Sequence, residues 1–166
     1  KSMKKNIAVY AGTFDPVTNG HLDIIERASR MFDVLYVTIC INPNKQGLFT
    51  IAERKELLKK VCQQFDNVIV DSSDKLSVEY AKDVGSKILV RGIRATMDFE
   101  YELQLAFSNQ YLDKDVDMVF LMTKPSHSFI SSSAVKEMVS HKRHVAGLVP
   151  ACVEEALQKK FQKLNG

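Results

Sequence analysis

Short apolar segments rich in β-branched residues alternate with longer amphipathic segments, and this alternation limits the fold more than any other feature of the chain. The first apolar segment, Ile7 to Ala11, ends at Gly12, and Val34 to Ile41 is continuously apolar, as expected of a strand covered on both faces. Between them, apolar residues recur from Gly20 to Met31 with the spacing of an amphipathic helix. The chain is therefore predicted to begin with two strands joined by a helix.

The same alternation continues to the end of the chain. Thr50 and Glu53 form the pattern of a capping box, which predicts the start of a helix. Further strands are predicted over residues 68–70, 88–90 and 118–122, and further helices over residues 50–64, 76–84, 97–112, 131–141 and 149–164. Five strands separated by helices indicate parallel βαβ units joined by right-handed crossovers. We therefore predict an α/β fold with a doubly wound, Rossmann-like, five-stranded parallel sheet flanked by helices.

The chain has the organisation of one domain. No repeat or linker-like stretch interrupts the alternation, and 166 residues fall within the range of a single domain. We assign residues 3–166 to this domain and interpret Lys1 and Ser2, which precede Met3, as an expression remnant.

Composition excludes several classes of protein. Hydrophobic residues make up 45% and charged residues 26%, which is ordinary for a globular domain and excludes a disordered chain. There is no secretory signal pattern and no apolar run long enough to span a membrane, so we expect a soluble, cytoplasmic protein without a membrane partner. The net charge of +3 is too small and too scattered to predict nucleic-acid binding, although it suits an anionic small-molecule ligand.

The residues that most often bind metals do not cluster in this sequence. Cys40, Cys62 and Cys152 lie far apart without a C-x-x-C pair, so we expect free, buried or half-buried thiols. His141 and His144 lie three residues apart in a basic stretch without carboxylate or cysteine partners, and we interpret them as surface residues. No protein-built metal site is predicted.

The first strand ends in a loop whose residues suit phosphate binding. Doubly wound sheets bind ligands beyond the carboxyl ends of their strands. The loop from Gly12 to His21 matches neither a Walker loop nor G-x-G-x-x-G, but it places the hydroxyl of Thr13 at the strand end and Gly20-His21 at a helix start. A helix start offers free amides to a phosphate, and a histidine there can donate a hydrogen bond to it. A lone histidine is more often structural, but this position favours a function for His21.

Two later segments have similar chemistry. Arg91 and Arg94 flank Gly92 after the fourth predicted strand, and arginines in this arrangement can bind phosphates bidentately. The alternative is a solvated basic turn with a local salt bridge. Ser131 to Ser133 begin another predicted helix, where hydroxyls and open amides can hold phosphates. The alternative there is a simple serine N-cap.

These motifs resemble a known family. Gly12 to Pro16 followed by Thr18 to His21 resembles the first signature of the nucleotidylyltransferase superfamily, and Ser128 to Ser133 resembles the second. Many members carry histidine at the position of Thr18, whereas the phosphopantetheine adenylyltransferases share the threonine. The resemblance extends from Ile7 to the final helix.

The resemblance implies an enzyme activity. Phosphopantetheine adenylyltransferases transfer AMP from ATP to 4′-phosphopantetheine in coenzyme A biosynthesis, releasing pyrophosphate and dephospho-CoA. It also implies Mg²⁺ with the ATP, coenzyme A as a further ligand, and a homohexamer built as a dimer of trimers. Asp15 has two open interpretations, contact with a metal-bound water or a turn residue before Pro16.

The resemblance also implies roles for individual residues. His21 would stabilise the transition state at the α-phosphate, and the catalytic set is His21, Thr13, Lys45 and Arg91. The residues expected to bind ATP are Thr13, Phe14, His21, Gly92, Ile93, Arg94, Glu102, His127, Ser128, Phe129, Ile130, Ser131, Ser132 and Ser133. The residues expected to bind phosphopantetheine are Thr13, Lys45, Ser77 and Arg91.

Two other functions stay open at this stage. The chain could be another nucleotidylyltransferase of this fold that attaches CMP or AMP to a different phosphorylated acceptor. It could also be a nucleotide sensor that binds ATP without releasing pyrophosphate, although such a sensor would not need all four of Thr13, His21, Lys45 and Arg91.

The predicted helix over 97–112 bears on assembly. Its apolar residues fall on nearly every side, which is more than one sheet face can cover. We expect the excess to be buried between subunits. The alternative is that the final helix, over 149–164, covers it within one chain.

Overall fold

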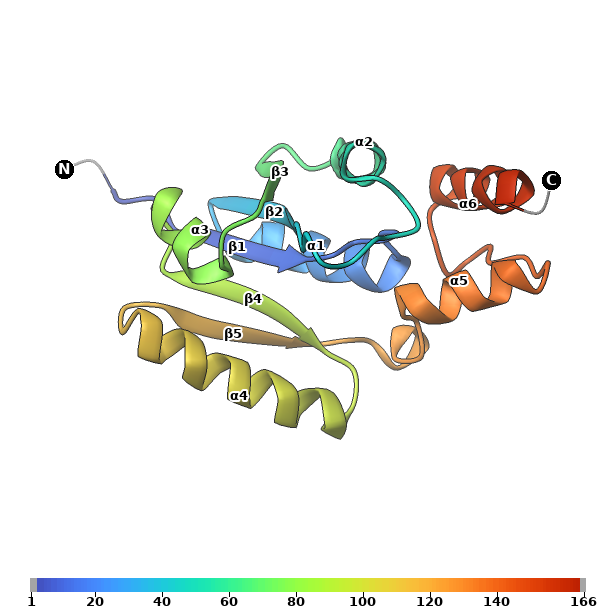
Figure 1. Ribbon diagram of the computed structural model, residues 1–166. Helices are drawn as coiled ribbons and strands as arrows, with labels where there is room; N and C mark the ends of the chain where they lie inside the picture. The colour runs from blue at the N-terminus through green and yellow to red at the C-terminus, as the bar shows by residue number, and fades with distance from the viewer. Residues whose placement is uncertain (1–2, 165–166) are drawn as a thin grey trace.

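The computed structural model describes residues 3–164, apart from the side chains of 96–98, so Lys1 and Ser2 lie outside the described residues. The strands are β1 (Ile7–Gly12), β2 (Val34–Cys40), β3 (Val68–Ser73), β4 (Ile88–Ile93) and β5 (Asp117–Met122). The helices are α1 (Asn19–Met31), α2 (Ile51–Cys62), α3 (Ser77–Asp83), α4 (Thr96–Leu112), the 3₁₀ helix η1 (Pro125–His127), α5 (Ser132–Ser140) and α6 (Ala151–Leu164). Strands and helices alternate as predicted (Figure 1).

The five strands form one parallel sheet with the order β3-β2-β1-β4-β5, which confirms the predicted doubly wound fold. The chain first winds outward from β1 to β3, then crosses back and adds β4 on the other side of β1. The topological switch point therefore lies between β1 and β4. The carboxyl ends of these two strands are where a ligand is expected in such a sheet.

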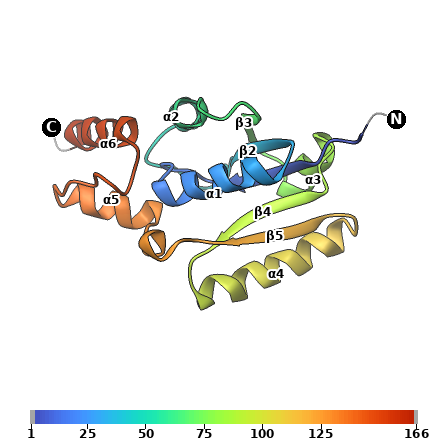
Figure 2. The same ribbon diagram turned by 180° about the vertical axis from the view of Figure 1, so that it is seen from behind.

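The sheet separates two hydrophobic cores. The larger core joins α1, α2, α5 and α6 to one face and includes Ile24, Leu35 and Leu58, all almost fully buried. The smaller core packs α3 on the opposite face and includes Val78 and Leu89. Figures 1 and 2 show the sheet from opposite sides, with α5 and α6 beyond the carboxyl end of β1.

β3 and β4 each extend three residues further than predicted. β3 continues through Asp71 to Ser73, and β4 continues through Arg91 to Ile93. These polar residues do not give an apolar strand pattern, but their backbones pair with neighbouring strands, Asp71 with Thr38 and Arg91 with Phe120. Arg91 and Gly92 therefore lie within β4, not after it as predicted.

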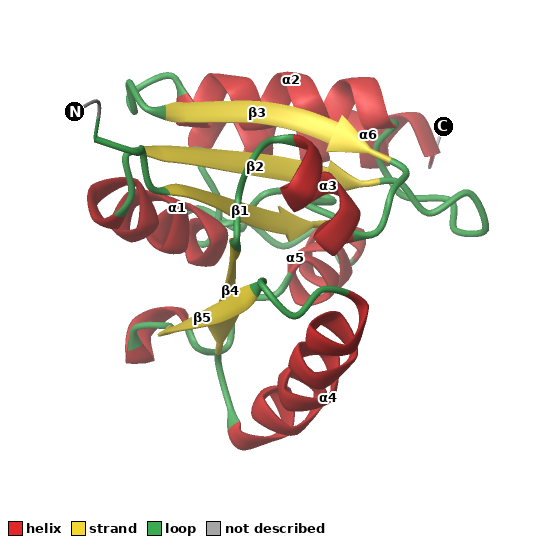
Figure 3. Cartoon of the chain, turned by 90° about the vertical axis from the view of Figure 1, so that its left-hand side faces the viewer, coloured by secondary structure: helices red, strands yellow, loops and turns green. Residues whose placement is uncertain are grey.

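Helix α4 packs on β4 and β5 alone, apart from minor contacts, and leaves much of its surface exposed. Its exposed apolar side chains are Phe99, Tyr101, Phe107, Tyr111 and Leu112. Helix α6 instead packs on α5. Figure 3 shows α6 near α2, on the opposite side of the molecule from α4. The alternative that the final helix covers this surface within one chain is therefore wrong.

Smaller expectations are also settled by the structure. The three cysteines are free, with Cys62 buried and the other two half-buried, as predicted. His141 and His144 are exposed, which confirms them as surface residues. Among the helices described, none is both long enough and apolar enough to cross a membrane.

Candidate active site

Two adjoining pockets lie at the carboxyl end of the sheet. The first, of about 550 Å³, is centred on the ends of β1 and β4, at the switch point. The second, of about 620 Å³, lies under the loop between β2 and α2. Thr13, Cys40 and Ser132 line both pockets, so the pockets form neighbouring parts of one site. Together they are large enough for a nucleotide and a second substrate.

His21 lies in the first turn of α1 and lines the first pocket. The backbone N–H of Thr18 donates a hydrogen bond to Nδ1 of His21 over 3.0 Å, and the Thr18 hydroxyl accepts one from the His21 backbone N–H over 3.3 Å. This is a capping box in which histidine takes the place of the usual acid. Because Nδ1 accepts the hydrogen bond from Thr18, the neutral ring carries its proton on Nε2.

The surroundings of His21 keep its ring neutral. Burial, together with the positive charges of Arg94 and Arg91, lowers the pKa of His21 from 6.5 to about 4. At neutral pH the ring is therefore an uncharged hydrogen-bond donor through Nε2. It can stabilise negative charge on a phosphoryl oxygen, but it is not a general acid in this pH range.

Aromatic packing fixes the ring of His21. The ring of Phe14 lies edge-on to it with centroids 5.0 Å apart, and Tyr10 packs on Phe14 at 5.3 Å. Phe14 is buried and has a positive φ of 46°, a conformation that sends its side chain inward while neighbouring Thr13 stays exposed. A contact of Phe14 with ATP would therefore involve its backbone rather than a stacked ring.

Arg91 is held in place by a buried carboxylate. Its Nε and Nη2 donate to the two oxygens of Glu102 over 2.9 and 2.7 Å, and its Nη1 donates to the Ala11 carbonyl over 2.9 Å. Burial works to lower the pKa of Arg91, but the hydrogen bonds and charge of Glu102 outweigh it and raise the pKa overall. The predicted alternative of a solvated basic turn with a local salt bridge is wrong for Arg91, because its partner lies in α4 and the pair faces the pocket.

The second arginine and the serine segment lie together at the first pocket. Arg94 donates from Nη1 to the Ile130 carbonyl over 3.3 Å, which joins the end of β4 to the segment before α5. Ser131 is the N-cap of α5 and accepts from the Ala134 backbone N–H, so the simple N-cap interpretation holds for this serine. Ser132 instead donates to the Pro16 carbonyl over 2.8 Å, and Ser133 is exposed in the second pocket.

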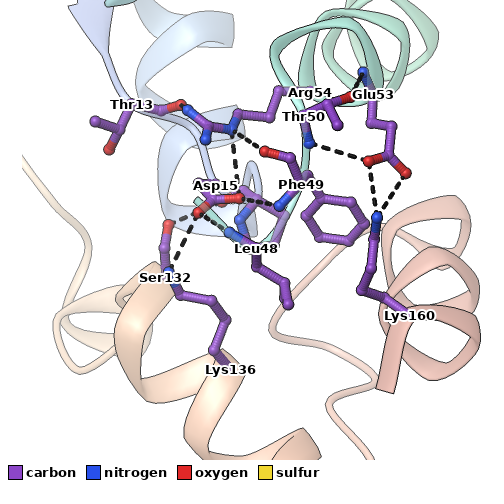
Figure 4. Close-up of polar contacts among 11 residues, drawn as sticks. Thr13, Asp15, Leu48, Phe49, Thr50, Glu53, Arg54, Ser132, Lys136 and Lys160 are labelled. Atoms are coloured by element: carbon purple, nitrogen blue, oxygen red, sulfur yellow. Dashed lines mark hydrogen bonds and ion pairs between the residues drawn. The ribbon is translucent and has the colours of Figure 1, made fainter. Parts of the chain in front are cut away.

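Lys45 lines the second pocket from the exposed loop between β2 and α2. The loop ends at Leu48 and Phe49, whose backbone N–H groups both donate to the carboxylate of Asp15 over 2.9 Å (Figure 4). Asp15 is buried and also faces Arg54 and Lys136. Of its two open interpretations, the structure supports a structural role in this turn.

The structure brings most of the predicted site residues to the two pockets. The first pocket is lined by Thr13, Phe14, His21, Ser77, Arg91, Gly92, Arg94, Glu102, His127, Ile130, Ser131 and Ser132. The second is lined by Thr13, Lys45, Ser132 and Ser133. Ile93, Ser128 and Phe129 line neither pocket: Ile93 is buried beside β5, and the Ser128 hydroxyl donates to the Pro125 carbonyl.

Sequence reasoning missed several residues of the site. Thr18 orients His21, and the spacing of three residues between a threonine at a helix start and its partner is a signal that could have revealed this cap. Tyr10 supports the aromatic packing. Arg54 and Lys136 line the second pocket from α2 and α5, and no local pattern connects them to it.

The carboxylates of the site are already occupied. Glu102 is paired with Arg91, and Asp15 accepts hydrogen bonds from the Leu48 and Phe49 backbones. Within residues 3–164 as described, no three His, Cys, Asp or Glu side chains are grouped to bind a metal ion.

Comparison with known proteins agrees with this geometry. A model of the family described as cytidylyltransferase-like matches residues 9–138. The chain is 50% identical over 157 residues to a protein of Carboxydothermus hydrogenoformans named phosphopantetheine adenylyltransferase, covering 95% of this chain and 97% of that one. It is 47% identical to a protein of the same name from Clostridium kluyveri, covering 94% and 95% of the two chains.

Solved structures share the fold at lower identity. A protein of Vibrio parahaemolyticus provisionally named nicotinate-nucleotide adenylyltransferase matches with a TM-score of 0.72 at 16% identity, over 94% of this chain and 93% of that one. The nicotinic acid mononucleotide adenylyltransferase of Plasmodium falciparum, in complex with NaAD, matches with a TM-score of 0.68 at 16% identity, over 94% and 96%. At this identity the similarity describes the fold alone.

Proposed function

The chain belongs to the cytidylyltransferase-like family of nucleotidylyltransferases, and we propose that it transfers AMP from ATP to 4′-phosphopantetheine, giving dephospho-CoA and pyrophosphate in coenzyme A biosynthesis. The observation that carries this proposal is the identity of 50% and 47%, along almost the whole chain, to two proteins named for this reaction. The two adjoining pockets around His21 supply a geometry that suits it.

The chemistry needs positioning more than acid–base catalysis. The terminal phosphate of phosphopantetheine attacks the α-phosphorus of ATP, a new P–O bond forms to that oxygen, and the bond to the bridging oxygen of the leaving pyrophosphate breaks. The attacking phosphate is already an anion at neutral pH, so no general base is required. Catalysis then comes from alignment and from stabilisation of charge on the transferred group.

We assign to His21 the stabilisation of the transferred phosphoryl group. Its Nδ1 is bound by the Thr18 backbone, so Nε2 is left as a donor of fixed direction. A donor held in place before the reaction costs little reorganisation as charge develops, which is what makes such groups effective. The low pKa of His21 means that this donor is neutral and constant through the physiological range.

We assign the other polar residues by their pocket. Lys45 and Thr13 would hold the acceptor phosphate from the second pocket and its border, with Arg91 facing it from the first. Arg94 and the start of α5 would hold ATP, with Ser77 on the acceptor side. These assignments place arginine and lysine side chains next to the phosphates of both substrates, which is where their positive charge is needed.

We expect Mg²⁺ to enter bound to ATP, where it would neutralise phosphate charge. The chemistry of the donor set suits this route, because Thr13 and Ser133 offer neutral oxygens while Asp15 and Glu102 are already paired. Since the reaction consumes ATP, we place it in the cytoplasm.

We further propose that the chain assembles as a hexamer, a dimer of trimers, through surfaces that include α4. Among the described side chains of this helix, five large apolar ones are exposed, including Tyr111 at 89% and Phe107 at 63%. Large apolar side chains exposed in this number on one helix are typical of a subunit contact.

A thermal-shift series with product analysis tests the function. ATP, phosphopantetheine and coenzyme A should each raise the melting temperature, and mass spectrometry should detect dephospho-CoA only when ATP and phosphopantetheine are both present. Preference for CTP over ATP would favour a cytidylyltransferase with another acceptor. Stabilisation by ATP without any product would favour the nucleotide sensor.

A further inference from the structure

The carboxylate of Asp15 is the point at which three segments of the site meet. Asp15 lies in the β1–α1 loop, Leu48 and Phe49 end the loop that carries Lys45, and Lys136 projects from α5 (Figure 4). Arg54, on α2, completes the group. Asp15 and Arg54 are 6% and 7% exposed, so this is a buried charge cluster beside the second pocket.

The carboxylate accepts hydrogen bonds at three of its positions and forms an ion pair with Arg54 at a fourth. Oδ1 accepts from the Phe49 N–H at 2.9 Å and lies 3.4 Å from Arg54 Nε, while Oδ2 accepts from the Leu48 N–H at 2.9 Å and lies 3.4 Å from Lys136 Nζ. An ionised carboxylate has about four such positions. A neutral amide of the same shape could not fill them, because its NH₂ group would face another donor.

The loop backbone packs tightly against this cluster. A Cβ atom placed on Gly47 would overlap the guanidinium of Arg54 and come within 2.7 Å of Asp15 Oδ2. Arg54 also donates from Nε to the Phe49 carbonyl over 2.9 Å. The buried pair of Asp15 and Arg54 therefore holds the end of the loop, residues 47–49, in a single position.

The other end of the loop is also fixed, at the sheet. The Ile41 backbone N–H donates to the Ser73 carbonyl of β3 over 2.9 Å. Residues 42–47, with Lys45 among them, span the distance between this anchor and Asp15. Because Lys45 itself is exposed, the two anchors decide where its ammonium group can reach.

We propose that Asp15 is a positioning residue that holds the Lys45 loop in place for the acceptor phosphate. In this role Asp15 acts through the backbones of Leu48 and Phe49, whose N–H groups donate to its carboxylate, and not through a bond to the substrates. This inference rests on the proposed function for the identity of the acceptor, but the placement of the loop can be measured without turnover.

The first measurement is hydrogen exchange of residues 41–50 in Asp15→Asn and in the full wild-type chain. The Leu48 and Phe49 amides should exchange at least about tenfold faster in the variant, because loss of the charged acceptor opens the loop locally. Asp23→Asn is the matched control, since Asp23 is also buried and paired with two cations, Arg27 and Lys124. It should leave exchange at 41–50 unchanged. Unchanged exchange in Asp15→Asn would overturn the proposal even if the chain proved to have another activity.

The second measurement is a double-mutant cycle with Lys45→Ala. Asp15→Asn should raise the KM for phosphopantetheine about tenfold or more, with the dissociation constant of ATP changed by no more than about twofold. In the Lys45→Ala background the same change should have little further effect on that KM, because the group that Asp15 positions is gone. Fully additive effects would show that Asp15 acts only on stability and would overturn the proposal.

Arg54→Lys provides a second variant if Asp15→Asn does not fold. It keeps the positive charge but removes the Nε donor to Phe49. It should shift exchange and KM in the same direction by a smaller factor, and wild-type values for both would overturn the proposal. A wild-type chain that releases no pyrophosphate with phosphopantetheine would refute the proposed function alone, because the exchange result still decides the role of Asp15.

Discussion

At the residue scale, His21 has two tasks: its ring caps the start of α1, and its Nε2 faces the first pocket as a hydrogen-bond donor. The sequence predicts only the second task. A polar residue at a helix start predicts a free donor, but the structure shows the His21 ring packed on Phe14 and bound to the Thr18 backbone. The same contacts that orient Nε2 therefore also stabilise α1. A substitution at His21 has to be interpreted with both tasks in view.

Replacing His21 separates the two tasks. His21→Ala should lower turnover by at least roughly 100-fold, the scale for losing one preorganised transition-state donor, while ATP still binds. It should also lower stability by about 1 kcal/mol through loss of the cap. His21→Gln, whose amide can place a donor near the position of Nε2, should retain more turnover than His21→Ala. Steady-state kinetics on folded variants check this, and turnover of His21→Ala within a few-fold of wild type would contradict the assigned role.

The pH dependence of stability gives an independent measure of the same ring. Burial, with Arg94 and Arg91, lowers the pKa of His21 from 6.5 to about 4, so the folded chain holds fewer protons than the unfolded chain between these values. The contribution of the neutral ring to the free energy of unfolding is fully present above pH 6.5. It is lost as the pH falls toward 4, because the unfolded chain then gains a proton that the folded chain does not. Urea unfolding should show a steeper loss of stability in acid for wild type than for His21→Asn, and parallel profiles would contradict a neutral His21 ring in the folded chain.

Asp15 shows what the sequence cannot reveal at this scale. Asp15-Pro16 is a turn signal, and its structural role was one of two open interpretations. Its partners, however, lie 33, 34 and 121 residues away. Contacts between residues so far apart in the chain depend on the fold, so the spacing of residues in a local motif cannot predict them.

At the element scale, apolar segments were predictable and polar strand ends were not. The predicted helices agree with the structure to within two residues at each end. All five strands were predicted at their places along the chain. β3 and β4 were cut short at Asp71 and Arg91, because strand pairing rather than side-chain pattern extends them. This matters for function, since Arg91 is aimed by a strand and not by a mobile turn.

The cap of α2 tests the element account. Thr50 accepts from the Glu53 backbone N–H, and the Glu53 side chain accepts from the Thr50 backbone N–H. Thr50→Ala should lower the free energy of unfolding by about 1 kcal/mol, whereas Thr50→Ser should keep most of it because the hydroxyl remains. Urea titration at fixed protomer concentration measures both, and equal stability of Thr50→Ala and wild type would show that the cap contributes nothing.

At the scale of the whole molecule, the parallel sheet places chemistry from distant segments at one edge. The loops after β1, β2 and β4 all reach the two pockets, which is the arrangement that a doubly wound sheet predicts. Helix α4, by contrast, has more apolar surface than its own chain covers.

Assembly is the prediction that follows from α4. Light scattering at micromolar concentration should give roughly six times the protomer mass of 18.8 kDa. Phe107→Glu and Tyr111→Glu should shift the mass toward smaller species, because each places a charge in the expected contact. Leu164→Glu, at an exposed apolar residue of α6, is the matched control and should leave the mass unchanged. A wild-type mass near 18.8 kDa would refute the assembly while leaving the chemistry intact.

The central claim is the transfer of AMP to phosphopantetheine, and pyrophosphate release tests it most directly. Wild-type protein with MgATP should release pyrophosphate only when 4′-phosphopantetheine is added, at a rate that saturates in both substrates and nearly disappears in His21→Ala. Release with CTP in place of ATP should be far slower. No release above background with ATP and phosphopantetheine together would contradict the account.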